Sequence, residues 1–156
     1  MYNAWNYYRI YKSEINKLIK QNQEAQLTPT NCMKILVVDD EKDIQTLFEQ
    51  RFRKEIREKI VELVFAFSGE DALAYLKENE QEAVLILSDI NMPGMSGLEL
   101  LRHIKEEYLK PPPPIVMMIT AYADDENYAR AKELGADDFL TKPVDFKLLK
   151  EKLKLN

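Results

Sequence analysis

Four short apolar runs, each followed by polar residues, constrain the fold of this 156-residue chain more than any other feature. The runs cover residues 35–38, 84–88, 115–119 and 139–141. The polar residues that follow them are Asp39, Asp40, Asp89, Thr120 and Lys142. In a parallel sheet these side chains would converge at the carboxyl edge, where open α/β sheets place their ligand sites. Three carboxylates, a hydroxyl and an ammonium predict a site for a divalent cation and a phosphoryl group.

Strand-like runs alternate with helical patterns from Met33 onward. We expect strands over residues 34–39, 61–67, 83–88, 115–120 and 138–141. We expect helices over residues 43–57, 69–76, 97–108, 124–134 and 145–155. Five repeats of strand and helix predict an α/β fold, a doubly wound parallel sheet with helices on both faces. The inward stripe of the first helix is predicted to hold Ile44, Leu47, Phe48, Phe52 and Ile56.

The first 32 residues follow a different pattern. Apolar and aromatic side chains recur at helical spacing at Tyr8, Tyr11, Ile15 and Leu18. We therefore expect an amphipathic helical extension and linker over 1–32 and one domain over 33–156. The extension could pack on the domain, support a homodimer or belong to a further segment upstream.

Composition narrows the function classes. The chain has a net charge of −5, and residues 1–32 carry four basic and two acidic side chains, so the domain is more acidic than the whole. An acidic domain repels nucleic-acid phosphates, so we expect no direct nucleic-acid binding. A single cysteine, Cys32, excludes an intramolecular disulfide. No apolar run reaches membrane-spanning length and no signal-peptide core is present, so we predict a cytoplasmic protein.

The predicted nucleophile is Asp89, and the loop that follows it is bent by Pro93 and two glycines. A carboxylate that attacks phosphorus is repelled by the phosphoryl oxygens, and a hard cation offsets this repulsion. Mg²⁺ suits such a site because it binds one or two carboxylates together with phosphate oxygens and waters. Asp39 and Asp40 would supply the extra negative charge that holds it.

Two further residues complete the predicted site. Lys142 would neutralise one phosphoryl oxygen, and the Thr120 hydroxyl would donate a hydrogen bond to another. Taken alone, each site residue has an ordinary structural explanation, such as helix capping for the acidic pair or a turn for Asp89. Their joint position at the strand ends of one sheet favours the functional interpretation.

The motifs around these residues resemble the receiver domain of bacterial response regulators. Residues 34–41 resemble its first strand and acidic pair, and residues 89–97 resemble its phosphoacceptor and the following loop. Thr120 with Ala121 resembles its hydroxyl followed by a small residue. Residues 139–143 resemble its aromatic switch, lysine and proline. The resemblance covers about residues 33–156.

This resemblance implies a flavodoxin-like sheet of order 2-1-3-4-5. Asp89 would accept a phosphoryl group from a sensor histidine kinase, a phosphotransfer protein or a small donor such as acetyl phosphate. Asp40, Asp89 and the Asn91 carbonyl would bind Mg²⁺ directly, and Asp39 would act through water. The Lys142–Pro143 peptide bond would be cis. The only chemistry expected is the domain's own phosphorylation and dephosphorylation, so we do not expect an enzyme.

The resemblance also implies a switch. Thr120 would move toward phosphorylated Asp89, and Phe139 would turn into the vacated space, which changes a face that binds a downstream protein. Because Phe139 has no hydroxyl to keep hydrated, we predict that its inward state is populated before phosphorylation. Tyr122 and Asn91 are predicted to border the phosphoryl site, with Tyr122 tuning the phosphoryl lifetime by hindering the hydrolytic water.

Two other classes remain to be weighed. A phosphatase of the haloacid-dehalogenase type also uses an aspartyl phosphate and Mg²⁺, but it needs its nucleophile after the first strand and a second Asp two residues on, where this chain has Glu41. A flavodoxin-like flavin carrier needs hydroxyls and backbone donors after the first strand. The acidic residues 39–41 would instead repel a flavin phosphate.

Overall fold

The computed structural model describes residues 13, 32–80, 84–109, 113–121 and 123–155. Five parallel strands form one sheet of order β2-β1-β3-β4-β5, which confirms the predicted fold. The strands are β1 (Met33–Val38), β2 (Val61–Ala66), β3 (Val84–Asp89), β4 (Ile115–Thr120) and β5 (Asp138–Thr141). The helices are α2 (Asp43–Arg51), α3 (Arg53–Arg57), α4 (Gly69–Glu78), α5 (Gly97–Glu107), α6 (Asp125–Glu133) and α7 (Phe146–Leu153).

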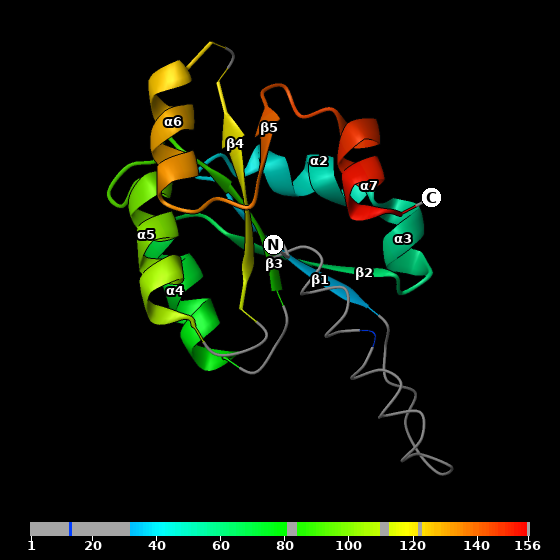
Figure 1. Cartoon of the computed structure of the whole chain (residues 1–156). Coiled ribbons are helices and arrows are strands. Elements are labelled where there is room, and N and C mark those ends of the chain that lie inside the picture. Colours follow the sequence, from blue (N-terminus) through cyan, green and yellow to red (C-terminus); the bar gives the residue numbers. More distant parts are fainter. Residues whose placement is uncertain (1–12, 14–31, 81–83, 110–112, 122, 156) are drawn as a thin grey trace.

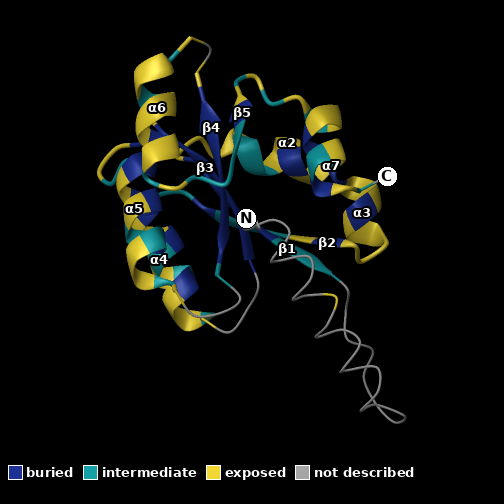
Figure 2. Cartoon of the chain, viewed as in Figure 1, coloured by how far each residue is buried: buried dark blue, intermediate teal, exposed yellow. Residues whose placement is uncertain are grey.

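The sheet is covered on both faces. Helices α4, α5 and α6 lie on one side, and α2, α3 and α7 lie on the other (Figure 1). Along β1, Leu36 and Val38 join the apolar cluster of the first side, whereas Ile35 and Val37 join that of the second. All residues of β3 and β4 are buried (Figure 2). Burial on both faces explains why the central strands are continuous apolar runs.

The strand register brings the carboxyl ends of β1 and β3 to the same level. Val38, the last residue of β1, is paired with Ser88 of β3. The next residue of each chain segment is therefore an aspartate, Asp39 beside Asp89. On the other side of β3, Asp89 is paired with Ile119 of β4. Thr120 follows directly, so the polar residues are set along one edge of the sheet.

The prediction of a single helix over residues 43–57 is wrong. Residues 43–57 form two helices that meet at Phe52, whose backbone leaves helical geometry at φ −99° and ψ 14°. The ammonium of Lys150 on α7 donates to the Arg51 carbonyl oxygen at this break, at 2.7 Å. A donor that reaches into a helical hydrogen-bond ladder is a known cause of such breaks.

The predicted inward stripe of this helix is also partly wrong. Leu47 and Ile56 are 37% and 36% exposed, although both were expected to face the core. Phe48 and Phe52 are fully buried, and their rings pack with Phe146 of α7 at centroid distances of 5.0 to 6.1 Å. Phe48 and Phe52 are thus the fully buried residues of this stretch, and they contact α7.

The predicted N-terminal extension lies outside the described residues, apart from Ser13, which is helical and exposed. Among the residues that the structure describes, no helix combines the length and apolarity needed to cross a membrane.

The aromatic contact leads to a stability prediction. Replacing Phe52 with alanine should lower the free energy of unfolding by about 3–5 kcal/mol, because a fully buried ring is lost. The control Leu47→Ala on the same stretch of chain should cost less than about 1 kcal/mol, because Leu47 is already partly solvated. Urea unfolding followed by circular dichroism measures both. Equal losses for the two variants would contradict the observed packing.

Candidate functional site

Three carboxylates meet at the carboxyl edge of the sheet. Asp39 and Asp40 follow β1, Asp89 ends β3, and one carboxylate oxygen from each lies within 4.8 Å of the others. Asp39 and Asp89 are buried, whereas Asp40 is exposed, so the cluster is open to solvent on one side. Oxygen donors at this spacing fit a hard divalent cation such as Mg²⁺, which prefers carboxylates and retains several waters.

The buried position of Asp39 has an electrostatic consequence. Its Oδ1 atom accepts a hydrogen bond from the backbone N–H of Glu41 at 2.9 Å. Burial raises the pKa of the Asp39 carboxyl, and the charge of Asp89 raises it further, against the lowering effects of the Glu41 N–H and of Lys142. The pKa of Asp39 therefore lies above the ordinary value for an aspartate. Folding thus disfavours the charged form of this side chain relative to the neutral form.

Lys142 faces the same cluster from the end of β5. Its ammonium Nζ donates to Asp89 Oδ2 at 2.9 Å. Burial alone would lower the pKa of Lys142, but the hydrogen bond to Asp89 and the negative charges of Asp89 and Asp39 outweigh it and raise the pKa. Lys142 therefore remains positively charged at neutral pH. Its peptide bond to Pro143 is cis, as the resemblance implied.

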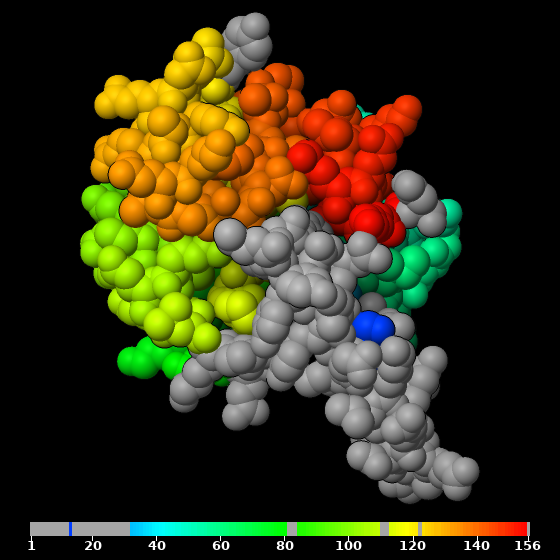
Figure 3. Space-filling view, in the orientation of Figure 1, coloured from blue at the N-terminus to red at the C-terminus, as the bar shows by residue number. Residues whose placement is uncertain are grey.

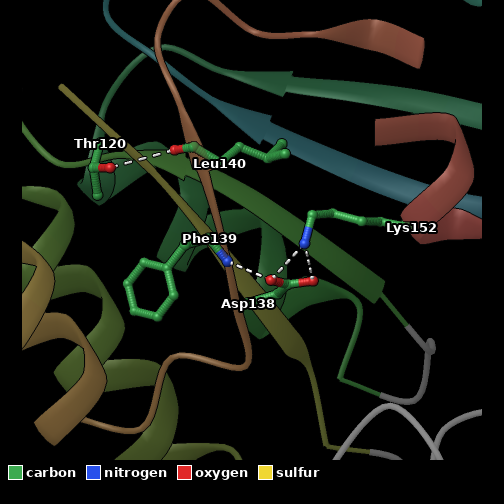
Figure 4. A network of polar contacts seen from close by, with 5 residues as sticks. All are labelled: Thr120, Asp138, Phe139, Leu140 and Lys152. Atoms are coloured by element: carbon green, nitrogen blue, oxygen red, sulfur yellow. Dashed lines mark hydrogen bonds and ion pairs between the residues drawn. The ribbon is translucent and has the colours of Figure 1, made fainter. Parts of the chain in front are cut away.

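The end of β4 carries the hydroxyl of Thr120. Thr120 is buried, and its Oγ1 donates to the Leu140 carbonyl oxygen of β5 at 3.4 Å (Figure 4). This distance is long for a bond between a hydroxyl and a carbonyl oxygen. The hydroxyl therefore has a partner that it can exchange at little cost.

Phe139 lies next to this hydroxyl partner on β5. Its ring points toward the helical layer in Figure 4 and contacts the ring of Tyr128 on α6, with centroids 4.3 Å apart. Phe139 is half-buried and packs against the apolar cluster on the α4–α6 side. That the inward state of the Phe139 side chain is populated before phosphorylation stays a prediction.

Strand β5 also contacts α7. The carboxylate of Asp138 pairs with Lys152 Nζ at 3.0 Å and accepts from the backbone N–H of Phe139 at 2.7 Å (Figure 4). Residues of α6, β5 and α7 lie side by side on one face of the molecule (Figure 3). Strand β5 thus contacts α6 through the Phe139 ring and α7 through the Asp138 carboxylate.

The loop after Asp89 is closed by a tight backbone approach at Gly97. The Gly97 N–H donates to the Ile90 carbonyl oxygen at 2.7 Å, and a Cβ at Gly97 would lie 1.9 Å from the Asp89 carbonyl oxygen. No side chain fits there. The Ser88 hydroxyl donates to the same Asp89 oxygen at 2.9 Å. Asn91 lies within this loop and is exposed.

The structure thus brings together Asp39, Asp40, Asp89 and Lys142, and it places Thr120 at the end of the neighbouring strand β4. Tyr122, the predicted tuning residue, lies outside the described residues. Sequence reasoning missed Glu70, whose carboxylate contacts the loop after Asp89. From the sequence, an acidic residue in the first turn of a helix predicts a favourable interaction with the helix dipole, but it does not predict a contact with a distant loop.

The sequence pattern described as "Response regulator receiver domain" matches residues 35–154. With the parallel sheet and the carboxylate cluster in place, this match shows that the chain belongs to the response-regulator receiver family.

Solved structures of receivers are similar over most of this chain. A response regulator receiver domain protein from Clostridium thermocellum is 30% identical, with a TM-score of 0.67, covering 78% of this chain and 91% of that one. The chemotaxis protein CheY4 of Vibrio cholerae is 26% identical, with a TM-score of 0.63, covering 79% and 97%. A CheY-like receiver domain protein from Methanospirillum hungatei is 27% identical, with a TM-score of 0.61, covering 76% and 89%.

The raised pKa of Asp39 generates a prediction. Without divalent cations at pH 7, Asp39→Asn should raise the free energy of unfolding, because it removes a buried charge and keeps an acceptor for the Glu41 N–H. The pKa is raised on folding, so the penalty is present above the folded pKa and is relieved as the pH falls through it. The gain should therefore vanish in acid.

Denaturant titrations at pH 7 and in acid, with and without Mg²⁺, measure this effect. Saturating Mg²⁺ should stabilise the wild type more than the variant, which provides the internal control. An Asp39→Asn protein no more stable than the wild type at pH 7 without Mg²⁺ would show that the buried charge of Asp39 does not destabilise the fold.

Proposed function

We propose that this receiver takes a phosphoryl group onto Asp89 from the phosphohistidine of a sensor kinase or phosphotransfer protein. The observation that supports it most directly is the environment of Asp89. This buried carboxylate lies within a cluster of three acidic groups and has one oxygen held by the Lys142 ammonium at 2.9 Å. A carboxylate beside both cation ligands and a fixed positive charge suits phosphoryl transfer, in which positioning and electrostatics dominate.

In the proposed reaction a carboxylate oxygen of Asp89 forms a bond to phosphorus while the bond between phosphorus and the donor histidine nitrogen breaks. Asp40, Asp89 and the Asn91 carbonyl would hold Mg²⁺, which neutralises charge on the phosphoryl oxygens. Lys142 then exchanges its contact with the carboxylate for one with a phosphoryl oxygen. The donor histidine leaves with its electron pair and takes up a proton from solvent.

The proposed output is a change on the face formed by α6, β5 and α7. An aspartyl phosphate offers the Thr120 hydroxyl a charged acceptor in place of the Leu140 carbonyl, to which its bond is long. Movement of Thr120 would free space beside β5 for the Phe139 ring, at the expense of its contact with Tyr128. The phosphoryl group shifts the two states only by the difference in its contacts with each. A downstream protein would read the new surface.

The rival classes fit less well. In a haloacid-dehalogenase site the nucleophile follows the first strand, which would be Asp39 here, and a second aspartate lies two residues further on. In this chain that second position is Glu41, whose backbone N–H donates to Asp39. The acidic cluster repels the phosphate that a flavin carrier binds at this edge. We therefore propose a signalling domain whose only chemistry is its own phosphorylation and dephosphorylation, acting in the cytoplasm.

The test uses acetyl phosphate with Mg²⁺ and intact-protein mass spectrometry. The wild type should gain about 80 Da, one phosphoryl group on one carboxylate, and Asp89→Asn should gain nothing. Asp125→Asn, an exposed aspartate in the first turn of α6, is the matched control and should gain the same mass as the wild type. A wild type that stays unmodified, or an Asp89→Asn protein that is modified to the same extent, would refute the proposal.

A further inference from the structure

The loop between β3 and α5 touches a second element that is distant in sequence. Oε1 of Glu70, in the first turn of α4, accepts a hydrogen bond from the backbone N–H of Met95 at 3.1 Å. A Cβ at Gly94 would lie 3.1 Å from the same oxygen, and Gly94 has a φ of +73°. The carboxylate is therefore seated closely against the backbone at the tip of this loop.

Packing reinforces this hydrogen bond. The side chain of Met95 lies against Gly69, where a Cβ would come within 2.9 Å of the methionine Cγ and Sδ. Met95 is also partly buried against the apolar cluster on the α4–α6 side of the sheet. The N-terminus of α4 thus holds the loop tip through one polar and one apolar contact.

The other end of the loop is anchored separately. The Gly97 N–H bonds to the Ile90 carbonyl oxygen at 2.7 Å, and the Ser96 hydroxyl caps α5 by accepting from the Glu99 N–H. These contacts belong to β3 and α5. Asn91 lies between the anchored base and the tip, and it is exposed. Ile90 and Met92, on either side of Asn91, are buried in the apolar cluster on the α4–α6 side. The loop is therefore held at its base, beside Asn91 and at its tip.

We propose that Glu70 is a positioning residue for the cation site: it holds the loop tip so that the Asn91 carbonyl is preorganised as a ligand. This inference rests on the proposed function, which assigns that carbonyl to Mg²⁺. A loop fixed in its binding conformation before the cation arrives loses less entropy on binding, so the affinity is higher. Glu70 itself does not touch the cation in this proposal.

Glu70 also has a local role that must be separated from the contact with the loop. An acidic residue in the first turn of a helix interacts favourably with the helix dipole. Asp71 lies in the same turn of α4 and is exposed, and within the described part of the chain its carboxylate makes no hydrogen bond or ion pair. Asp71→Ala therefore removes the same charge from the same turn but leaves the loop contact intact.

The experiment compares Glu70→Ala, Glu70→Gln and Asp71→Ala in the full chain. Amide hydrogen exchange by NMR reports on the Met95 N–H, and calorimetry with MgCl₂ reports on cation affinity. Loss of one hydrogen bond predicts about tenfold faster exchange at Met95 and about three- to tenfold weaker Mg²⁺ binding in Glu70→Ala. Glutamine keeps an oxygen acceptor, so it should restore both, and Asp71→Ala should match the wild type.

The outcomes separate this inference from the proposed function. If the wild type binds Mg²⁺ and Glu70→Ala binds it as tightly as Asp71→Ala does, the role of Glu70 fails and the proposed function stands. A glutamine variant as impaired as the alanine variant would also overturn the inference, because charge rather than the hydrogen bond would then be responsible. If the wild type binds no Mg²⁺, the proposed function fails, and the affinity claim for Glu70 fails with it.

Discussion

The repulsion among three carboxylates at one edge of the sheet is the constraint that the candidate site places on the rest of the structure. Asp39, Asp40 and Asp89 offer oxygens within 4.8 Å of one another, and two of these side chains are buried. Like charges at this distance destabilise a folded protein unless a positive charge balances them. The Lys142 ammonium balances part of the charge, while burial, together with the charge of Asp89, raises the pKa of Asp39. A bound cation would offset the charge that remains.

The scaffold makes this arrangement possible because its stability comes from elsewhere. Strands β1, β3 and β4 are buried on both faces, and their register fixes the level of the residues that follow them. At Gly97 the chain approaches the Asp89 carbonyl oxygen so closely that no side chain fits. The apolar core thus supplies the free energy that offsets the electrostatic strain at the edge.

The sequence alone predicted the features that follow from local pattern. The strands were recognisable because burial on both faces makes them continuous apolar runs, and Asp39, Asp89 and Lys142 were recognisable because they end such runs. The resemblance to receivers supplied the strand order. The break at Phe52, the exposure of Leu47 and the hold of Glu70 on Met95 were not predictable, because each depends on contacts with residues remote in sequence. Periodicity reports the face of a helix and carries no information on the element that it meets.

We infer that the acidic cluster and the loop after Asp89 form one cation site. The most direct measurement is anomalous diffraction from a crystal of the wild-type protein equilibrated with Mn²⁺, which accepts the same oxygen ligands as Mg²⁺. We expect one strong peak bound by carboxylate oxygens of Asp40 and Asp89 and by the Asn91 carbonyl. A map with no peak between these residues at saturating Mn²⁺ would contradict it.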